Sequence, residues 1–377
     1  MINIIHKEDC CGCSACAQIC PKECISLQRD NEGFIYPNTN INDCIECHLC
    51  EKVCPILNSI KENEPNKVLA VKNKDNYIRE MSSSGGVFYE IAKQVILQNG
   101  VVYGAKFSAQ WNVEHAMAYN IDQLIPLMRS KYVQSDINKT YINIKDNLKD
   151  GKRVLFVGTP CQVAGLNSFL KYKKYSNLTT IDFLCHGVPS PKVWQLYIKE
   201  ITKKNKAEIS NISFRDKKLG WRNYKLTFSF SNSTSWSEVH RNNIYMKGFL
   251  NNLYLRPSCY ACKFKRFQSK SDLTIADYWG IYRYLPEFDD NLGVSLVFIN
   301  TAEGEKLIDS KLFNIKETSF TSTLSNKGLD KYTPKHPKRE YFFKHIDSYS
   351  NNISKLIDLC IKENVIKKII KIIKNRI

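Results

Sequence analysis

Cysteine spacing in the first 55 residues repeats one ligand pattern. CxxCxxCxxxCP occupies residues 10–21 and recurs at 44–55, with every position offset by 34. Three thiolates on one tight loop can bind three irons of a 4Fe-4S cube, while the fourth cysteine turns toward the neighbouring cube. The spacing therefore predicts two 4Fe-4S clusters that exchange their fourth ligands. The expected sets are Cys10, Cys13, Cys16 with Cys54, and Cys44, Cys47, Cys50 with Cys20.

Zinc is the alternative metal for such cysteines. Zinc sites use two CxxC pairs or mixtures of Cys and His, and neither requires a third cysteine and a trailing Cys-Pro, twice over. His48 lies inside the second loop and is expected to face solvent. Cys11 and Cys24 fall outside the pattern and are expected to be small buried residues.

Composition and charge limit the function classes. The chain has 377 residues, 15 cysteines and a net charge of +18, without a recognisable secretory signal at its start. Because nothing points to secretion, a cytoplasmic location is expected, and in such a reducing compartment clustered thiols bind metal. Residues 1–58 carry four Lys or Arg against eight Asp or Glu. The excess of basic residues therefore lies in the rest of the chain, where it is scattered. A zinc-stabilised nucleic-acid binder has only this charge to support it, and no nucleic-acid partner is expected.

After the cysteine-rich segment, the predicted elements that must position further functional residues alternate between strands and helices. The fold class predicted is an α+β ferredoxin-like head, an α/β domain with a mixed sheet, and a helical C-terminal tail. Predicted strands lie at residues 68–71, 101–107, 153–157, 179–184 and 273–276, and the stretch 212–230 is β-like. The domain divisions expected are 1–58, 67–145, 146–300 and 301–377.

Four further cysteines could bind a third cube. Cys161 and Cys185 follow predicted strands, where ligands gather in α/β sheets, and Cys259 and Cys262 form an isolated CxxC pair. The alternative is two buried apolar cysteines and a CxxC pair without metal. The spacing alone leaves both interpretations open.

Several sequence blocks resemble the coenzyme F-420 hydrogenase/dehydrogenase beta-subunit family. They run in order from about residue 67 to residue 300. The blocks are SSSGGVF (82–88), SKYVQS (130–135), GTPCQVAGL (158–166), CHGVPSP (185–191), FRDKKLGW (214–221), PSCYAC (257–262) and SDLTIADYWG (271–280). The resemblance implies an FAD-containing oxidoreductase whose third 4Fe-4S cluster is held by Cys161, Cys185, Cys259 and Cys262 beside the flavin.

The resemblance also implies a flavin site. Glycines before a helix let the backbone approach a phosphate, so candidate FAD contacts are Ser83, Ser84, Gly85, Gly86, Lys131 and Thr159. An ordinary serine cap of the helix is the alternative for the serines, and a surface lysine is the alternative for Lys131. Lys131 would place a cation near the flavin ring. No GxGxxG fingerprint is present.

Candidate catalytic residues flank the third cysteine set. His186 and Asp182 could move a proton, and Arg215 and Lys217 could bind an anionic substrate. The alternatives are a structural Asp182, a His186 that donates to the cluster, and solvated charges.

Partners follow from the predicted redox role. We expect a redox partner protein or a small-molecule electron donor, with a deazaflavin coenzyme and a homo-oligomer as further candidates. An electron-transfer adaptor without its own substrate is the second functional hypothesis. Residues 353–377 predict a basic amphipathic helix, which could lie on an anionic membrane but more commonly would pack on protein.

Overall fold

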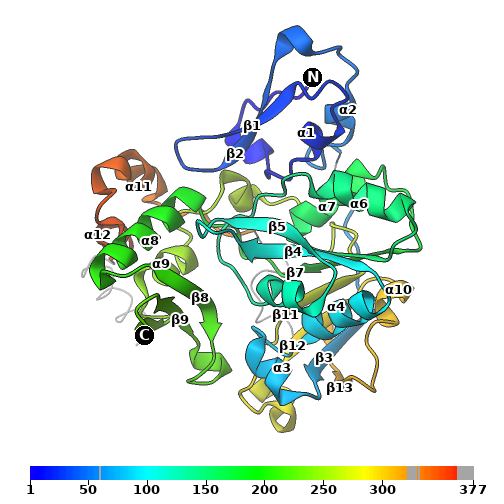
Figure 1. The fold of residues 1–377 in the computed structure, drawn as a ribbon, viewed down its shortest axis with the longest axis vertical. Coiled ribbons are helices and arrows are strands. Elements are labelled where there is room, and N and C mark those ends of the chain that lie inside the picture. Colours follow the sequence, from blue (N-terminus) through cyan, green and yellow to red (C-terminus); the bar gives the residue numbers. More distant parts are fainter. Residues whose placement is uncertain (59–60, 321–328, 330–331, 363–377) are drawn as a thin grey trace, which may run out of the picture.

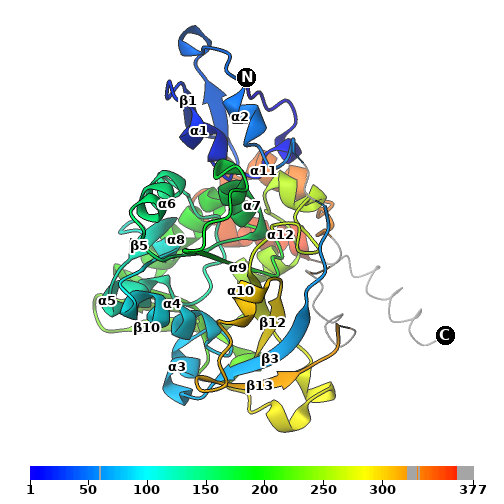
Figure 2. The ribbon, with the colours of Figure 1, turned by 90° about the vertical axis from the view of Figure 1, so that its right-hand side faces the viewer.

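The computed structural model describes residues 1–58, 61–320, 329 and 332–362. A small head, drawn in blue, stands at one end of a larger body (Figures 1 and 2). The body holds a central sheet and a second lobe built around a smaller sheet. The head is the cysteine-rich segment, so its position relative to the body decides where the predicted clusters lie.

The head is built on an antiparallel hairpin and two short helices. Strands β1 (Ile25–Arg29) and β2 (Ile35–Thr39) pair antiparallel, with Ile25 opposite Thr39. Helices α1 (Ala15–Ile19) and α2 (Leu49–Lys52) each begin inside one of the cysteine repeats. Each follows a residue in the left-handed conformation, which turns the chain sharply enough to place successive cysteines on one loop.

The central sheet has eight strands in the order β13-β3-β12-β11-β7-β6-β4-β5. Neighbours from β4 to β11 pair parallel, and antiparallel strands complete both edges. Its strands are β3 (Lys67–Asn73), β4 (Val101–Phe107), β5 (Val113–Ala118), β6 (Val154–Val157), β7 (Leu178–Phe183), β11 (Leu273–Asp277), β12 (Ser295–Ile299) and β13 (Phe313–Glu317). The predicted mixed sheet is therefore confirmed.

Both faces of the central sheet are covered, as the alternation along each strand requires. In β6, Leu155 faces one core with α4 (Val87–Leu97), and its neighbour Phe156 faces another with α7 (Pro160–Phe169). The remaining helices of the body are α3 (Asn76–Met81), α5 (Ile121–Leu124), α6 (Thr140–Lys149), α8 (Pro191–Asn205), α9 (Ile244–Leu250), α10 (Ala302–Glu305), α11 (Arg339–His345) and α12 (Ile353–Ile361).

The second lobe packs helices on a three-stranded antiparallel sheet. Strands β8 (Ile209–Asp216), β9 (Lys225–Phe230) and β10 (Ser235–Val239) form it in the order β10-β9-β8. Its core is aromatic, and Trp194 is fully buried between Phe214 and Tyr245. Helix α12 packs on α8 and α9 in this lobe.

Most predicted elements are found within a residue or two of their expected bounds. The β-like stretch differs, because Trp221–Asn223 is a short 3₁₀ helix and the strand starts only at Lys225. The first part of the predicted tail helix, residues 353–361, is seen as α12, and the rest of that prediction, residues 363–377, lies outside the described part. Within the described ranges, no helix has the length and apolar character needed to cross a membrane.

Candidate metal centres and cofactor site

The first cysteine-lined hollow lies in the head and is called the outer hollow. Cys44, Cys47 and Cys50 line it together with Cys20 from the other repeat, and Cys24 also lines it. Cys47 is exposed, and the Ile2 N–H donates to Cys50 Sγ over 3.3 Å. The structure thus brings together the four cysteines that the spacing assigned to one cube.

A second cysteine-lined hollow, the middle hollow, also lies in the head. Cys10, Cys13 and Cys16 line it with Cys54, which is the exchanged arrangement that the repeat predicts. Cys11 and Ile56 line the same hollow. Four sulfurs around one space suit a 4Fe-4S cube, because each iron takes one thiolate.

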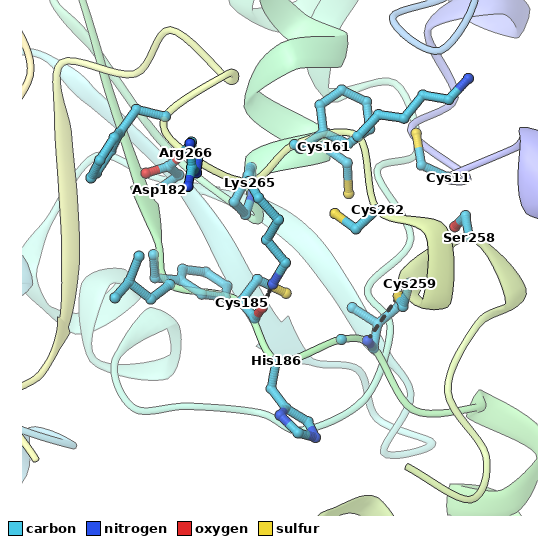
Figure 3. Close-up of a pocket in the computed structure, with 18 of the residues that line it drawn as sticks. Cys11, Cys161, Asp182, Cys185, His186, Ser258, Cys259, Cys262, Lys265 and Arg266 are labelled. Carbon is cyan, nitrogen blue, oxygen red and sulfur yellow. Dashed lines mark hydrogen bonds between the residues drawn. The ribbon is translucent and has the colours of Figure 1, made fainter. Parts of the chain in front are cut away.

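The third set of cysteines meets in the body and forms the deep hollow (Figure 3). Cys161 comes from the start of α7, directly after β6, and Cys185 follows the end of β7. Cys259 lies in the 3₁₀ segment Pro257–Ala261, and Cys262 ends that segment. The carboxyl ends of two parallel strands and one connecting segment therefore converge on a single space, as the sheet order allows.

Cys11 joins two of these spaces. It is buried, as expected, and it lines both the middle and the deep hollow. Cys13 also lies against the body, because a side chain at Gly165 of α7 would come within 2.8 Å of Cys13 Cβ. Cys161 lies at the start of the same helix. Helix α7 therefore contacts a cysteine of the middle hollow and carries a cysteine of the deep hollow.

Burial favours the protonated form of two of these thiols, one in the middle and one in the deep hollow. It raises the pKa of Cys16 to about 12 and that of Cys185 to about 12. The Val188 N–H donates to Cys259 Sγ over 3.4 Å. Metals bind the thiolate, so cluster assembly must release protons, and such N–H donors stabilise the charged sulfurs that result.

Across the described ranges, no group of three or more His, Cys, Asp or Glu side chains is arranged to hold a metal ion. His48 is exposed, as predicted, and its ring lies 2.7 Å from Glu51. All three hollows present cysteine sulfurs, which is the ligand chemistry of iron–sulfur cubes.

The predicted flavin loop, residues 83–86, is tightly held between β3, β12 and α4. A side chain at Gly85 would come within 2.4 Å of the Val71 carbonyl oxygen, and Gly86 has φ +83° directly before α4. Ser83 Oγ accepts from the Ser130 N–H over 2.8 Å, and Ser84 Oγ donates to the Val294 carbonyl. The Gly85 N–H is also engaged, because it donates to Ser295 Oγ over 3.0 Å. The backbone N–H groups from Gly86 onward, at the start of α4, are therefore the ones suited to a phosphate.

Lys131 and Thr159 lie in different settings. Lys131 Nζ donates to the carbonyl oxygens of Met128 and Arg129, and burial together with the Arg129 charge lowers its pKa to about 7. Because Ser130 bonds to Ser83, Lys131 is next to the flavin loop. Thr159 caps α7, and its hydroxyl lies 3.1 Å from Cys161 Sγ, so its direct contact is with the third cysteine set.

Arg215 and Lys217 hold the flavin loop in place. Arg215 is 1% exposed and donates to both carboxylate oxygens of Asp277, over 2.8 and 2.9 Å, and to the Ser83 carbonyl. Burial by itself would lower the pKa of Arg215, but the Asp277 charge outweighs it and the pKa is raised. Lys217 Nζ donates to carbonyl oxygens that include Ser84, and burial and Arg215 lower its pKa to about 7. Their predicted grip on an anionic substrate stays a prediction, since the contacts observed are internal.

Asp182 and His186 flank Cys185 at the end of β7. Asp182 is 1% exposed and accepts from the hydroxyls of Ser269 and Thr274, each over 2.5 Å. Burial raises its pKa to about 6. The His186 ring packs edge-on against Phe249 at 5.0 Å, and Asp182 and His186 both line the deep hollow (Figure 3). Their proton-transfer role stays a prediction.

Arg256 is the residue near these centres that sequence reasoning missed. It directly precedes the segment with Cys259, yet its side chain reaches the head and Cys10. A contact between residues 246 positions apart leaves no trace in local spacing. The only signal in the sequence was the position of an arginine beside a cysteine block.

Comparison with known proteins identifies two segments of the chain. Residues 151–319 match the C-terminal part of the beta subunit of coenzyme F420 hydrogenase/dehydrogenase, and residues 9–57 match the 4Fe-4S dicluster domain. No curated protein matches the sequence. Among solved structures, a xenon-derivatised F420-reducing [NiFe] hydrogenase complex from Methanosarcina barkeri contains a chain with 12% identity and a TM-score of 0.49. That alignment covers 76% of this chain and 94% of the other.

Proposed function

We propose that this chain is an iron–sulfur flavoprotein oxidoreductase. The matches of residues 151–319 to the C-terminal part of the coenzyme F420 hydrogenase/dehydrogenase beta subunit and of residues 9–57 to the 4Fe-4S dicluster domain support this proposal. The head provides two 4Fe-4S clusters for electron transfer. Cys161, Cys185, Cys259 and Cys262 hold a third cluster, and residues 83–86 with Lys131 contact FAD. FAD, when bound, supplies the exchange between two-electron chemistry and the single-electron steps of the clusters.

The observation that carries this proposal is the series of three cysteine-lined hollows. Cys47 of the outer set is exposed, whereas the deep set lies in the body between the strand ends and the second lobe. Cys11 and Ile56 line both the middle and the deep hollow, so those two spaces are neighbours. Such an arrangement suits electron passage between an external partner and the interior.

The body supports the flavin half of the proposal through its charges. Arg215 and Lys217 donate to the carbonyl oxygens of Ser83 and Ser84, and Arg129 donates to that of Met81. Lys131 lies next to Ser130, which bonds to Ser83. The pKa values of about 7 leave Lys131 and Lys217 only partly charged near neutral pH. A cation beside a flavin stabilises its anionic reduced form, and helix N-termini bind phosphate. The substrate, for which a deazaflavin coenzyme is one candidate, would bind beside the flavin. The redox partner would bind at the head.

An electron-transfer adaptor without its own substrate is the second candidate. It is favoured by the ion pair between Arg215 and Asp277, which engages the side chain predicted to grip an anionic substrate. The domain divisions, a homo-oligomer and a cytoplasmic location remain predictions in either case.

Anaerobic reconstitution with FAD separates the two candidates. We expect full-length protein to retain flavin after desalting, and one equivalent of dithionite to bleach the flavin band through the clusters. A Cys185→Ser variant should retain flavin but reduce it more slowly, because the third cluster is lost. Intact clusters without any retained flavin would contradict the enzyme proposal and favour the adaptor.

A further inference from the structure

Arg256 is a buried cation that points from the body into the head. Its side chain is fully buried, and Nε donates to the Cys10 carbonyl oxygen over 2.8 Å. One terminal nitrogen lies 3.5 Å from Cys10 Sγ and donates to the Ile35 carbonyl, and the other donates to Gln134. The guanidinium lies 4.4 Å from the Tyr36 ring centroid. Every polar donor of this side chain is thus aimed at the head or at its border.

The head loop is shaped around this guanidinium. Gly12, between Cys10 and Cys13, has φ +72°, and a side chain there would come within 2.8 Å of an Arg256 nitrogen. The cysteine loop therefore wraps closely over the charge, in a conformation that glycine adopts without strain.

The charge of Arg256 has no carboxylate partner among the ion pairs of the described residues. A buried cation is costly unless an anion compensates it. The group closest to Arg256 that becomes anionic is the Cys10 thiolate, when it binds a cube. The placement of Arg256 therefore suits an anionic cluster in the middle hollow.

We propose that Arg256 is a positioning residue that sets the reduction potential of the middle cluster, an inference that rests on the head clusters of the proposed function. A cube gains one negative charge when it is reduced. A fixed cation that donates a hydrogen bond to a ligand sulfur stabilises that extra charge, so the potential rises. The outer cysteines have no such contact with Arg256, and the middle cluster becomes the favoured electron acceptor of the head.

A purely structural role is the competing explanation, and Arg339 provides the control. Arg339 is also buried and also joins the body to the head, through a two-fold pairing with Glu32 and bonds to the Leu255 carbonyl. These partners are a carboxylate and a carbonyl, and neither is a cysteine sulfur. Substituting Arg339 disturbs the docking of the head without removing a charge from a cluster ligand.

The test is an EPR-monitored potentiometric titration of the full-length, anaerobically reconstituted protein. Arg256→Gln should decrease the equilibrium constant for reduction of one head cluster at least tenfold. For a one-electron couple this lowers its reduction potential by about 59 mV. The potential of the other head cluster should stay unchanged. Arg256→Lys keeps the charge, so its potential should lie close to that of the wild type. Arg339→Gln should move neither potential. Equal shifts in Arg256→Gln and Arg339→Gln, or no shift in Arg256→Gln, would overturn the proposal.

A second measurement covers the case in which Arg256→Gln does not assemble clusters. Pulsed EPR of the reduced wild-type protein, grown with ¹⁵N-arginine, should show a guanidinium nitrogen coupled to one cluster. This coupling should vanish in Arg256→Lys, and its absence in the wild type would refute the assignment. A wild-type protein without head clusters would instead refute the proposed function. If the protein has clusters but no flavin, the role of Arg256 can still be tested in the same way.

Discussion

The ion pair between Arg215 and Asp277 gives a quantitative test of whether Arg215 is structural or binds substrate. Both partners are well covered, with side-chain exposures of 1% and 17%. Arg215→Met leaves Asp277 with the Trp221 Nε1–H donor at 2.8 Å, but without its cation. The Ser83 carbonyl and the Tyr132 hydroxyl also lose a donor.

Removing one partner of a buried ion pair costs about 3–5 kcal/mol, because an uncompensated charge stays behind. We therefore expect Arg215→Met to lower the free energy of unfolding by that amount. Arg215→Lys keeps the charge but cannot make both bonds to Asp277, and should lose about half as much. Lys306→Met breaks an exposed pair with Glu303 and should change stability by less than about 1 kcal/mol.

Anaerobic urea denaturation, followed by circular dichroism, measures these differences. The double variant Arg215→Met/Asp277→Leu should recover part of the loss, because no charge is left unpaired. The reasoning is refuted if Arg215→Met unfolds within about 0.5 kcal/mol of the wild type. That outcome, with a raised KM for an anionic substrate, would support the substrate-binding role predicted from the sequence.

Further predictions concern the strand end and the flavin loop. Asp182 has a pKa of about 6 when folded, and the folded chain therefore binds the extra proton between about pH 4 and pH 6. The stability of the wild type relative to Asp182→Asn should fall by about 3 kcal/mol as the pH rises through that window. A difference between the urea midpoints of the two proteins that stays constant over this pH range would contradict this. Gly85→Ala places Cβ 2.4 Å from the Val71 carbonyl and should cost about 1–3 kcal/mol and flavin retention. Gly104→Ala is its control, because the nearest neighbour of the added Cβ would lie at 3.5 Å. Thermal melts of both variants measure the two losses, and equal losses would argue against the loop's tight fit.

The local parts of the fold could be predicted because they depend on local patterns. The cysteine repeat determined which residues line the outer and middle hollows, since the ligand spacing is itself the geometric requirement. The strands β4 and β6 were found from short apolar runs bounded by turn residues. Cys161 and Cys185 were expected at strand ends, and the parallel pairing of β6 with β7 places them side by side.

The parts that could not be predicted depend on contacts between distant segments. Arg256 reaches Cys10 across 246 positions, and Arg215 reaches Asp277 across 62. The periodicity of a strand shows that Arg215 lies in β8, but it does not reveal which carboxylate of the central sheet pairs with it. Cys11 looked like a small buried residue, and only the docking of the head on α7 shows that it lies between two cysteine sets.

Counting iron and acid-labile sulfide in one anaerobic preparation tests the central claim most directly. Three cubes predict about twelve iron and twelve sulfide atoms per chain in the wild type, and about eight of each in Cys259→Ser/Cys262→Ser. About eight in both proteins would remove the third cluster. A wild-type sample with zinc in place of iron would contradict the account as a whole.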